Sequence, residues 1–290
     1  MQCISCFLMG GLGNQLFQIF ATIAYAKKHN CTFVFKYSKE LLTGALRYTF
    51  WDTFLKDLIG YTTYGSNNSL LVPYIDNFPR YNESGFQYTP FPYVDNVKYL
   101  SLFGYFQSYK YFQDYWGDIK TMINLTSQQT SIYNDNKQLM ENKYNISMHF
   151  RLGDYKNKQH IHPVMKENYY INALSMILKK ISHRDDIQVL YFCEKEDIPI
   201  VNLMIQTINA THKTIAFVRV DNEICDWQQM LLMSCCDSNI IANSTFSWWG
   251  AYMNENADKC VCYPSLWFGK SHGVKSLHDL FPPSWHKIVC

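Results

Sequence analysis

Short apolar segments alternate with helical segments throughout the second half of the chain, and this order constrains the fold more than any other feature. The expected strands cover residues 144–150, 188–193, 214–220, 239–242 and 259–263, and the expected helices lie near 167–181, 199–208 and 226–236 and from 247 onward. Strands that are separated by helices of this length form a parallel sheet covered by helices. The pattern therefore predicts a Rossmann-like domain.

The first residues show the same order on a smaller scale. An apolar strand is expected at 3–9, a glycine-rich turn follows, and a helix at 14–28 leads to a second strand at 31–37. Between 43 and 115, prolines and scattered asparagines weaken the pattern, and no order of elements is predicted there. The chain is expected to be an α/β protein of two Rossmann-like domains, at 1–140 and 141–290.

Composition and charge exclude several classes of protein. The formal net charge is +2 and no run of Lys or Arg exceeds two residues, so the basic field of a nucleic-acid-binding protein is absent. No stretch approaches the roughly 20 apolar residues that span a bilayer, and a soluble cytoplasmic protein is expected. The 22 tyrosines and 7 tryptophans are compatible with sugar-stacking surfaces and equally with an AT-rich coding bias.

The potential metal ligands do not form a recognisable site. Ten cysteines are present, but Cys3 and Cys6 make the one Cys-x2-Cys pair, so reduced thiols are expected rather than zinc or disulfides. His160 and His162 have no third ligand nearby and are interpreted as loop residues. No Asp-x-Asp motif occurs, and the acidic segment 194–197 is interpreted as a solvated loop. No metal or other cofactor is expected.

The end of the strand at 144–150 carries unusual charge. His149 and Arg151 share one face if the strand keeps its alternation, and Gly153 then allows a turn before Asp154. Arg151 and Asp154 are therefore expected at the carboxyl edge of the sheet, where open α/β folds bind their ligands. A guanidinium group at that position suits a phosphate.

A second candidate site lies between the strand at 239–242 and the next helix. Its side chains and free backbone amides form a potential anion site at a helix start, and its residues are Asn243, Ser244, Thr245, Phe246 and Ser247. The alternative is that these residues bind no anion and that a Ser or Thr side chain simply caps the helix. Trp248 and Trp249 are interpreted as core residues rather than as a sugar platform.

The glycine-rich turn near the amino terminus is a third candidate. Its residues Gly11, Gly13, Asn14 and Gln15 do not fit a dinucleotide fingerprint, because the third glycine of that motif falls on Leu16 and no acidic residue follows in the second strand. Two interpretations remain open. The glycines of the turn serve packing alone, or the side-chain amides of Asn14 and Gln15 at the helix start recognise hydroxyl groups of a ligand.

Three segments together resemble the family-eleven α-1,2-fucosyltransferases and, more distantly, the protein O-fucosyltransferases and α-1,6-fucosyltransferases. They are 10–15, 149–155 and 240–251, and they occur in the same order in that family. The resemblance implies a GT-B architecture of two domains that face each other across a cleft. It also implies an inverting, metal-independent transfer of fucose, with GDP-fucose held by the second domain and the glycan acceptor by the first.

The resemblance assigns roles to the candidate residues. Arg151 contacts the diphosphate. From their positions, Asp154 is the nearest candidate base or instead orients His149 or Arg151, and His149 orients the site or is an ordinary strand histidine. Asn243, Ser244, Thr245, Phe246 and Ser247 line the donor pocket, and Gly11, Gly13, Asn14 and Gln15 face the cleft. Family members often carry a second arginine where this chain has Leu152. The chain resembles the soluble bacterial or viral members, which act in the cytoplasm of the cell or host.

The expected reaction moves L-fucose from GDP-β-L-fucose to the 2-hydroxyl of an acceptor sugar, with terminal galactose as the expected acceptor. Two alternatives remain open from the residues. One is a glycosyltransferase that uses another nucleotide sugar, and the other is a non-catalytic glycan-binding pseudoenzyme, which the substitution at Leu152 would permit.

Overall fold

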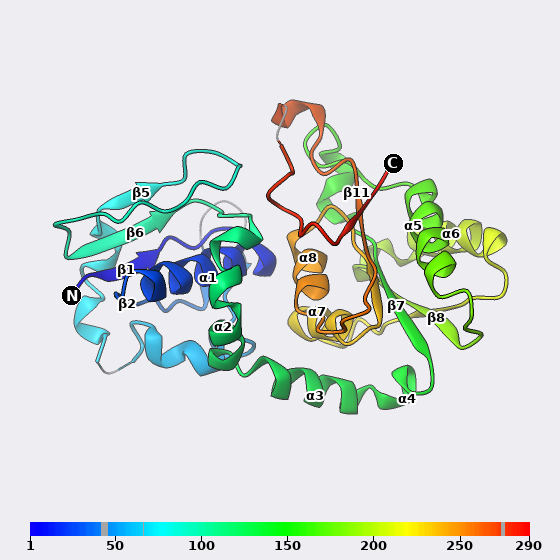
Figure 1. Cartoon of the computed structure of the whole chain (residues 1–290), viewed down its shortest axis with the longest axis horizontal. Coiled ribbons are helices and arrows are strands. Elements are labelled where there is room, and N and C mark those ends of the chain that lie inside the picture. Colours follow the sequence, from blue (N-terminus) through cyan, green and yellow to red (C-terminus); the bar gives the residue numbers. More distant parts are fainter. Residues whose placement is uncertain (42–45, 66, 274–275) are drawn as a thin grey trace. The chain divides into compact units, whose positions relative to one another are not determined.

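A computed structural model describes residues 1–41, 46–65, 67–273 and 276–290 of the chain. The chain divides into two compact units, which are described separately (Figure 1). The first comprises Met1–Ser127 and Ser276–Pro282, and the second comprises Gln128–Lys275 and Pro283–Cys290. The chain passes from the first unit to the second within helix α3 (Leu125–Asp135).

The first unit is built on a parallel four-stranded sheet. In spatial order its strands are β2 (Thr32–Phe33), β1 (Cys3–Cys6), β6 (Tyr99–Phe103) and β5 (Arg80–Asn82). The short strands β3 (Glu40–Leu41) and β4 (Arg47–Tyr48) pair with each other in antiparallel orientation. The helical elements are α1 (Leu12–Lys28), α2 (Trp116–Met122), η1 (Lys56–Tyr61), η2 (Ser69–Leu71), η3 (Ile75–Asn77), η4 (Tyr109–Tyr111) and η5 (Gln113–Tyr115).

Helix α1 forms much of the core of the first unit. Fourteen of its seventeen residues are buried, so this helix is covered on nearly all sides. Lys27 and Lys28 lie in its last turn, where positive charge stabilises the helix dipole. The strand, turn and helix at the start of the chain are thus confirmed, although the helix begins two residues earlier than predicted.

The second unit is built on a parallel six-stranded sheet. In spatial order its strands are β12 (His286–Ile288), β11 (Val261–Pro264), β10 (Ser238–Ile240), β7 (Tyr144–His149), β8 (Ile187–Phe192) and β9 (Ala216–Arg219). Its helices are α4 (Lys137–Met140), α5 (Glu167–Lys180), α6 (Ile198–Thr211), α7 (Asp226–Ser234) and α8 (Thr245–Tyr252), with 3-10 turns η6 (Gly153–Asn157), η7 (Lys195–Asp197) and η8 (Lys270–His272). Helices α5 and α6 cover one face of the sheet, and α7 and α8 cover the other (Figure 1).

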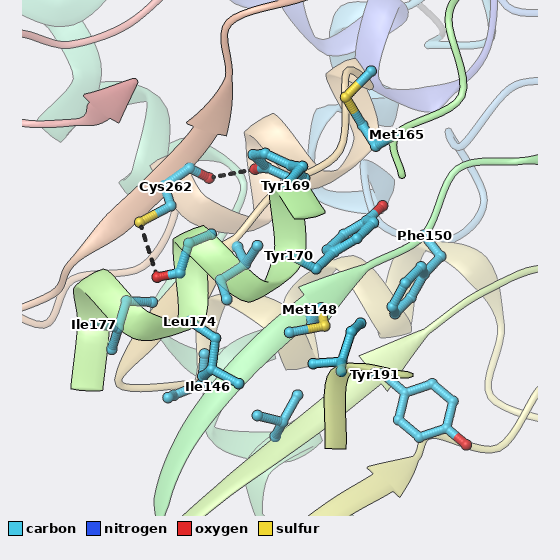
Figure 2. Packing of buried hydrophobic residues seen from close by; sticks show 14 of the residues in the cluster. Ile146, Met148, Phe150, Met165, Tyr169, Tyr170, Leu174, Ile177, Tyr191 and Cys262 are labelled. Atoms are coloured by element: carbon cyan, nitrogen blue, oxygen red, sulfur yellow. Dashed lines mark hydrogen bonds between the residues drawn. The ribbon is translucent and has the colours of Figure 1, made fainter. Parts of the chain in front are cut away.

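The predicted alternation of strands and helices in the second half is confirmed. All six residues of β7 and all six of β8 are buried, as expected for central strands that helices cover on both faces. Ile146, Met148 and Phe150 pack with Tyr170 of α5 in one apolar cluster (Figure 2). Ser147, on the opposite face, instead accepts a 2.7 Å hydrogen bond from the Asn239 side chain.

Two tyrosines of α5 fix the carboxyl ends of the central strands. The Tyr169 hydroxyl lies 2.5 Å from the carbonyl oxygen of Ile241 and 3.2 Å from that of Cys262, and the second contact is drawn in Figure 2. The Tyr170 hydroxyl donates a 3.1 Å hydrogen bond to the carbonyl of His149. Since buried hydroxyls need such partners, these bonds hold in place the strand ends from which the candidate site extends.

Candidate active site

Arg151 lies two residues beyond the end of β7, and charged groups from two elements hold its guanidinium. Nη2 donates to Asp154 Oδ1 over 2.6 Å, and Nη1 is bonded to Glu194. The guanidinium carbon also lies 4.9 Å from the centre of the Tyr155 ring. The side chain retains 23% exposure, so an anionic ligand can reach it.

The turn after Arg151 depends on a buried carboxylate. Asp197, at the start of α6, is fully buried and accepts hydrogen bonds of 2.6 Å from both the Gly153 amide and the Lys156 ammonium. Gly153 has φ +37°, a left-handed conformation in which a side chain would be strained. Its would-be Cβ position also lies 2.6 Å from the Glu194 carboxylate. The shape of the turn therefore depends on Gly153 and Asp197 together.

The interpretation of segment 194–197 as a solvated loop is wrong in part. Glu194 is exposed but bonded to Arg151, and Asp197 has no exposed surface. The physical reason is that β7 and β8 are neighbours in a parallel sheet, so residues that follow them meet at the same edge. Three carboxylates within four residues of a predicted strand end, with Pro199 at the start of the next helix, are the available signal.

Leu152 points into the core. It is 2% exposed and belongs to the apolar cluster that includes Phe150 and Tyr170. The residue that differs from the family pattern thus contributes to packing, while Arg151 keeps its polar partners.

His149 connects the end of β7 to helix α8. Its ring is 8% exposed and lies 5.4 Å from the Phe246 ring, centre to centre. Burial, together with the charge of Arg151, lowers the pKa of the imidazole to about 3. Within the described part of the chain, Nδ1 has no hydrogen-bond partner. His149 is therefore a neutral, buried polar group at this edge of the sheet.

This pKa predicts a specific pH dependence of stability. The unfolded histidine titrates near 6.5 and the folded one near 3, so between these values the unfolded state binds the additional proton. Stability due to His149 is complete above pH 6.5 and declines as the pH falls. Between pH 7 and pH 5 we expect the wild type to lose about 2 kcal/mol more unfolding free energy than His149→Asn, measured by urea denaturation. Parallel pH profiles for the two proteins would contradict the assignment.

Segment 243–247 forms the start of α8, as the sequence predicts. The Ser244 hydroxyl accepts a 3.3 Å hydrogen bond from the Phe246 amide, and the Ser247 hydroxyl donates to the Ser244 carbonyl over 3.4 Å. Thr245 is the first residue of the helix. Trp248 and Trp249 have no exposed surface, which confirms that they are core residues.

Asn243 and Tyr155 bring the two candidate segments of the second unit together. The Asn243 amide donates to the carbonyls of Pro163 (2.9 Å) and Trp267 (3.2 Å), and its Oδ1 has no partner among the described residues. The Tyr155 hydroxyl donates to the Asn243 carbonyl over 3.4 Å, while its ring lies against the Arg151 guanidinium. The side chains after β7, β8 and β10 therefore form one site at the carboxyl edge of the second sheet.

The glycine-rich turn lies in the first unit, at the carboxyl end of β1. The side chain of Gln15 is 1% exposed and donates to the carbonyls of Gly10 (3.0 Å) and Tyr48 (2.9 Å). Asn14 is half-buried and accepts a 3.0 Å hydrogen bond from Gln107. Gly11 caps α1, and Gly13 is buried in its first turn. The amide of Gln15 thus serves to join the turn to the chain near β4.

A family model described as Glycosyl transferase family 11 matches residues 66–288, more than half of the chain. The chain belongs to glycosyltransferase family 11. This glycosyltransferase is 31% identical over 191 residues to the O-antigen biosynthesis glycosyltransferase WbnK of Escherichia coli, an alignment that covers 61% of this chain and 58% of WbnK. It is 24% identical to an Escherichia coli alpha-1,2-colitosyltransferase, with 97% of each chain covered. A galactoside 2-alpha-L-fucosyltransferase of Caenorhabditis elegans is also 24% identical, over 96% of this chain and 77% of that protein.

Solved structures show the same fold at low sequence identity. POFUT1 in complex with GDP has a TM-score of 0.50 at 11% identity, and the match covers 90% of this glycosyltransferase and 97% of POFUT1. A family 9 glycosyl transferase from Veillonella parvula has a TM-score of 0.51 at 10% identity, with 100% and 86% of the two chains covered. With its two parallel sheets, the family 11 enzyme therefore has a GT-B-type α/β fold. In the described part of the chain, no helix has the length and apolar character needed to cross a membrane.

Proposed function

We propose that the chain transfers L-fucose from GDP-β-L-fucose to the 2-hydroxyl of an acceptor sugar, with terminal galactose as the acceptor and with inversion at the transferred carbon. The observation that carries the proposal is the accessible guanidinium of Arg151 at the carboxyl edge of the second sheet. Membership of family 11 supports it. Two relatives named for α-1,2 transfer, one of colitose and one of fucose, support it further.

Arg151 acts on the leaving group in this proposal. As the bond between fucose and GDP breaks, negative charge grows on the diphosphate, and a guanidinium can donate two parallel hydrogen bonds to phosphate oxygens. The first backbone amides of α8 add positive potential, because they have no partners within the helix. Groups that are already oriented toward developing charge lower the barrier most effectively. The acceptor's 2-hydroxyl oxygen bonds to the anomeric carbon from the opposite face as the bond to GDP breaks, and its proton passes to a carboxylate such as Asp154 or to water. No protein nucleophile is therefore required.

The neighbouring residues position Arg151 and shape the pocket. Asp154 holds one side of the guanidinium, and Asp197 fixes the turn that carries both residues. His149 stays neutral at physiological pH and cannot deliver a proton, so it lines the site in its uncharged form. The polar atoms His149 Nδ1 and Asn243 Oδ1 are buried without partners in the described part of the chain, so both can hydrogen-bond a ligand at this edge of the sheet.

The two units take different substrates in this proposal. The second unit (Gln128–Lys275 with Pro283–Cys290) is proposed as the donor domain and holds GDP-fucose through Arg151 and segment 243–247. The first unit (Met1–Ser127 with Ser276–Pro282) holds the acceptor near Gly11, Gly13 and Asn14 at the carboxyl end of β1. Asn14 is the more accessible of the two amides there, because Gln15 is buried.

The direct test is a transfer assay with the purified chain, GDP-fucose and lactose. We expect fucosyl lactose with an α-1,2 linkage, which NMR of the product identifies. If GDP binds by calorimetry but neither transfer nor donor hydrolysis occurs, the chain is a binding protein and the proposal fails. The same calorimetry experiment with UDP and UDP-sugars tests whether the chain is specific for the guanine base of the nucleotide.

One relative favours a second donor. The alpha-1,2-colitosyltransferase matches over nearly the whole chain, at 24% identity. A colitosyl donor would use the same Arg151 contact, since the diphosphate is common to both. Comparing kcat/KM for GDP-fucose and GDP-colitose decides between the two sugars.

Glu194 competes with the donor for Arg151, which leads to a prediction. In this proposal a phosphate oxygen takes the place of Glu194 at Arg151 Nη1, and Glu194 is exposed enough to move away. Glu194→Gln is expected to raise the affinity for GDP by about two- to fivefold, the range of an exposed ion pair, as measured by calorimetry. Glu196→Gln, two residues on and also exposed, is the matched control and should change little. Weaker GDP binding by Glu194→Gln would show that the carboxylate supports the site instead.

A further inference from the structure

Two short segments of the first unit run side by side beyond the end of β2. Phe35 forms a parallel bridge with Thr62. The Phe35 amide donates to the Tyr61 carbonyl and the Thr63 amide to the Phe35 carbonyl, each over 2.8 Å. The Tyr37 amide donates to the Thr63 hydroxyl over 2.9 Å. In this register Tyr37 lies opposite Tyr64.

This register places two tyrosine rings and a carboxylate together. The rings of Tyr37 and Tyr64 lie 4.9 Å apart, centre to centre, and are tilted by 39°. Tyr64 is 67% exposed although it is a large aromatic residue. The Tyr37 hydroxyl donates to Asp52 and lies 3.0 Å from each of its carboxylate oxygens. Asp52 is itself exposed, so both oxygens keep lone pairs that face solvent.

Stacked aromatic rings pack beside Tyr37, Asp52 and Tyr64. Trp51, next to Asp52, is 1% exposed and stacks on the buried Phe35 ring at 5.3 Å with an angle of 28°. Phe33 stacks on Tyr61 in the same way, at 4.8 Å and 20°. The side chains of Tyr37, Asp52 and Tyr64 therefore adjoin the buried stack of Trp51 and Phe35, which reduces the entropy lost when a ligand binds them.

The group lies at the carboxyl edge of the first sheet. Strand β2 runs parallel to β1, so Tyr37, which follows β2, is at the same edge as the glycine-rich turn, which follows β1. Gln15 also joins this turn to the carbonyl of Tyr48. Ligands of open α/β sheets bind at this edge.

The chemistry of the three side chains selects the ligand. An exposed aromatic face binds the C–H surface of a sugar ring, and a carboxylate accepts hydrogen bonds from sugar hydroxyls. The negative charge of Asp52 disfavours phosphates and other anions. A purely apolar partner would remove the carboxylate from water without replacing its hydrogen bonds, which is costly. An uncharged sugar can both stack on the exposed tyrosine ring and donate hydrogen bonds to the carboxylate.

We propose that Tyr37, Asp52 and Tyr64 form a binding surface, the tyrosine platform, for the neutral galactoside acceptor of the transfer reaction. The identity of the sugar rests on the proposed function. The Tyr64 ring stacks against the galactose, Asp52 accepts from its hydroxyl groups, and Tyr37 holds Asp52 in place.

Saturation-transfer NMR with lactose tests the tyrosine platform independently of catalysis. We expect the wild type to bind lactose, and Tyr64→Ala and Asp52→Ala to weaken binding by about tenfold, the effect of one aromatic contact or one charged hydrogen bond. Tyr64→Phe keeps the ring and should weaken binding by less than threefold. Tyr93→Ala is the matched control, because Tyr93 is 51% exposed and packs on His29, just beyond the carboxyl end of α1. Thermal denaturation verifies that each variant is folded.

The transfer assay then separates this proposal from the proposed function. The tyrosine platform predicts that Tyr64→Ala raises the KM for lactose about tenfold while GDP affinity stays unchanged. If lactose binds as described but GDP-fucose gives no product, the platform stands and the proposed function fails. If transfer to lactose occurs and Tyr64→Ala or Asp52→Ala leaves lactose binding unaltered, the proposed function stands and the platform is refuted. Absence of lactose binding by the wild type also refutes it.

Discussion

Arg151→Ala is expected to lower kcat for fucosyl transfer by about two orders of magnitude or more while the protein stays folded. The removed guanidinium would stabilise charge that develops on the leaving GDP, and the loss of one such contact commonly has this effect. Arg151→Lys keeps the charge but not the paired hydrogen bonds, so an intermediate rate is expected. Release of GDP in the presence of lactose measures the rate, and calorimetry measures the affinity for GDP.

The second sheet offers a matched control for this substitution. Arg184 precedes β8, pairs with Asp186 at 3.2 Å and lies over the Tyr144 ring at 5.0 Å. It thus repeats the ion pair and the ring contact of Arg151 at the amino edge of the same sheet, away from the proposed site. Arg184→Ala should transfer fucose at close to the wild-type rate. A rate for Arg151→Ala within fivefold of wild type would refute the proposed role.

Asp197→Ala is expected to lower the free energy of unfolding by about 2–4 kcal/mol, somewhat less than the roughly 3–5 kcal/mol of a fully buried ion pair, because Lys156 is partly exposed. The substitution removes the acceptor of the Gly153 amide and the partner of Lys156. It also releases the turn that carries Arg151, so kcat should fall in the folded protein as well. Urea denaturation gives the stability, and transfer assays below the unfolding midpoint give the rate.

Two further variants make the interpretation of Asp197 specific. Asp197→Asn keeps an acceptor for the Gly153 amide and is expected to lose less stability than the alanine variant. Asp221→Ala removes an exposed carboxylate that accepts from the Glu223 amide in a neighbouring loop, and should cost less than about 0.5 kcal/mol. If Asp197→Ala were no less stable than Asp221→Ala, the buried pair would not determine the conformation of the turn.

The local pattern of the chain predicted the second unit well because its elements are long and regular. Strands such as β7 and β8 are buried along their whole length, and α5 keeps its apolar residues on one face. By contrast, β6 was not predicted, although it pairs with β1 along the whole of that strand. It lies in a region of short 3-10 turns without long helices, and its partner is nearly a hundred residues away. The strand β12 was also not predicted: it has three residues, of which only Ile288 is buried, so it shows no apolar run.

Residue type and spacing alone determined the α/β class, the charged strand end at Arg151 and the hydroxyl-rich helix start at Ser244. These features depend on short stretches of chain, which local periodicity describes. Only the tertiary structure decided that Glu194 contacts Arg151, that Asp197 is buried and that Tyr37 lies beside Tyr64. Each of these contacts depends on which strands or extended segments become neighbours and in what register. Packing between distant parts of the chain determines which segments pair and in what register, so the sequence of one segment is not enough to predict it.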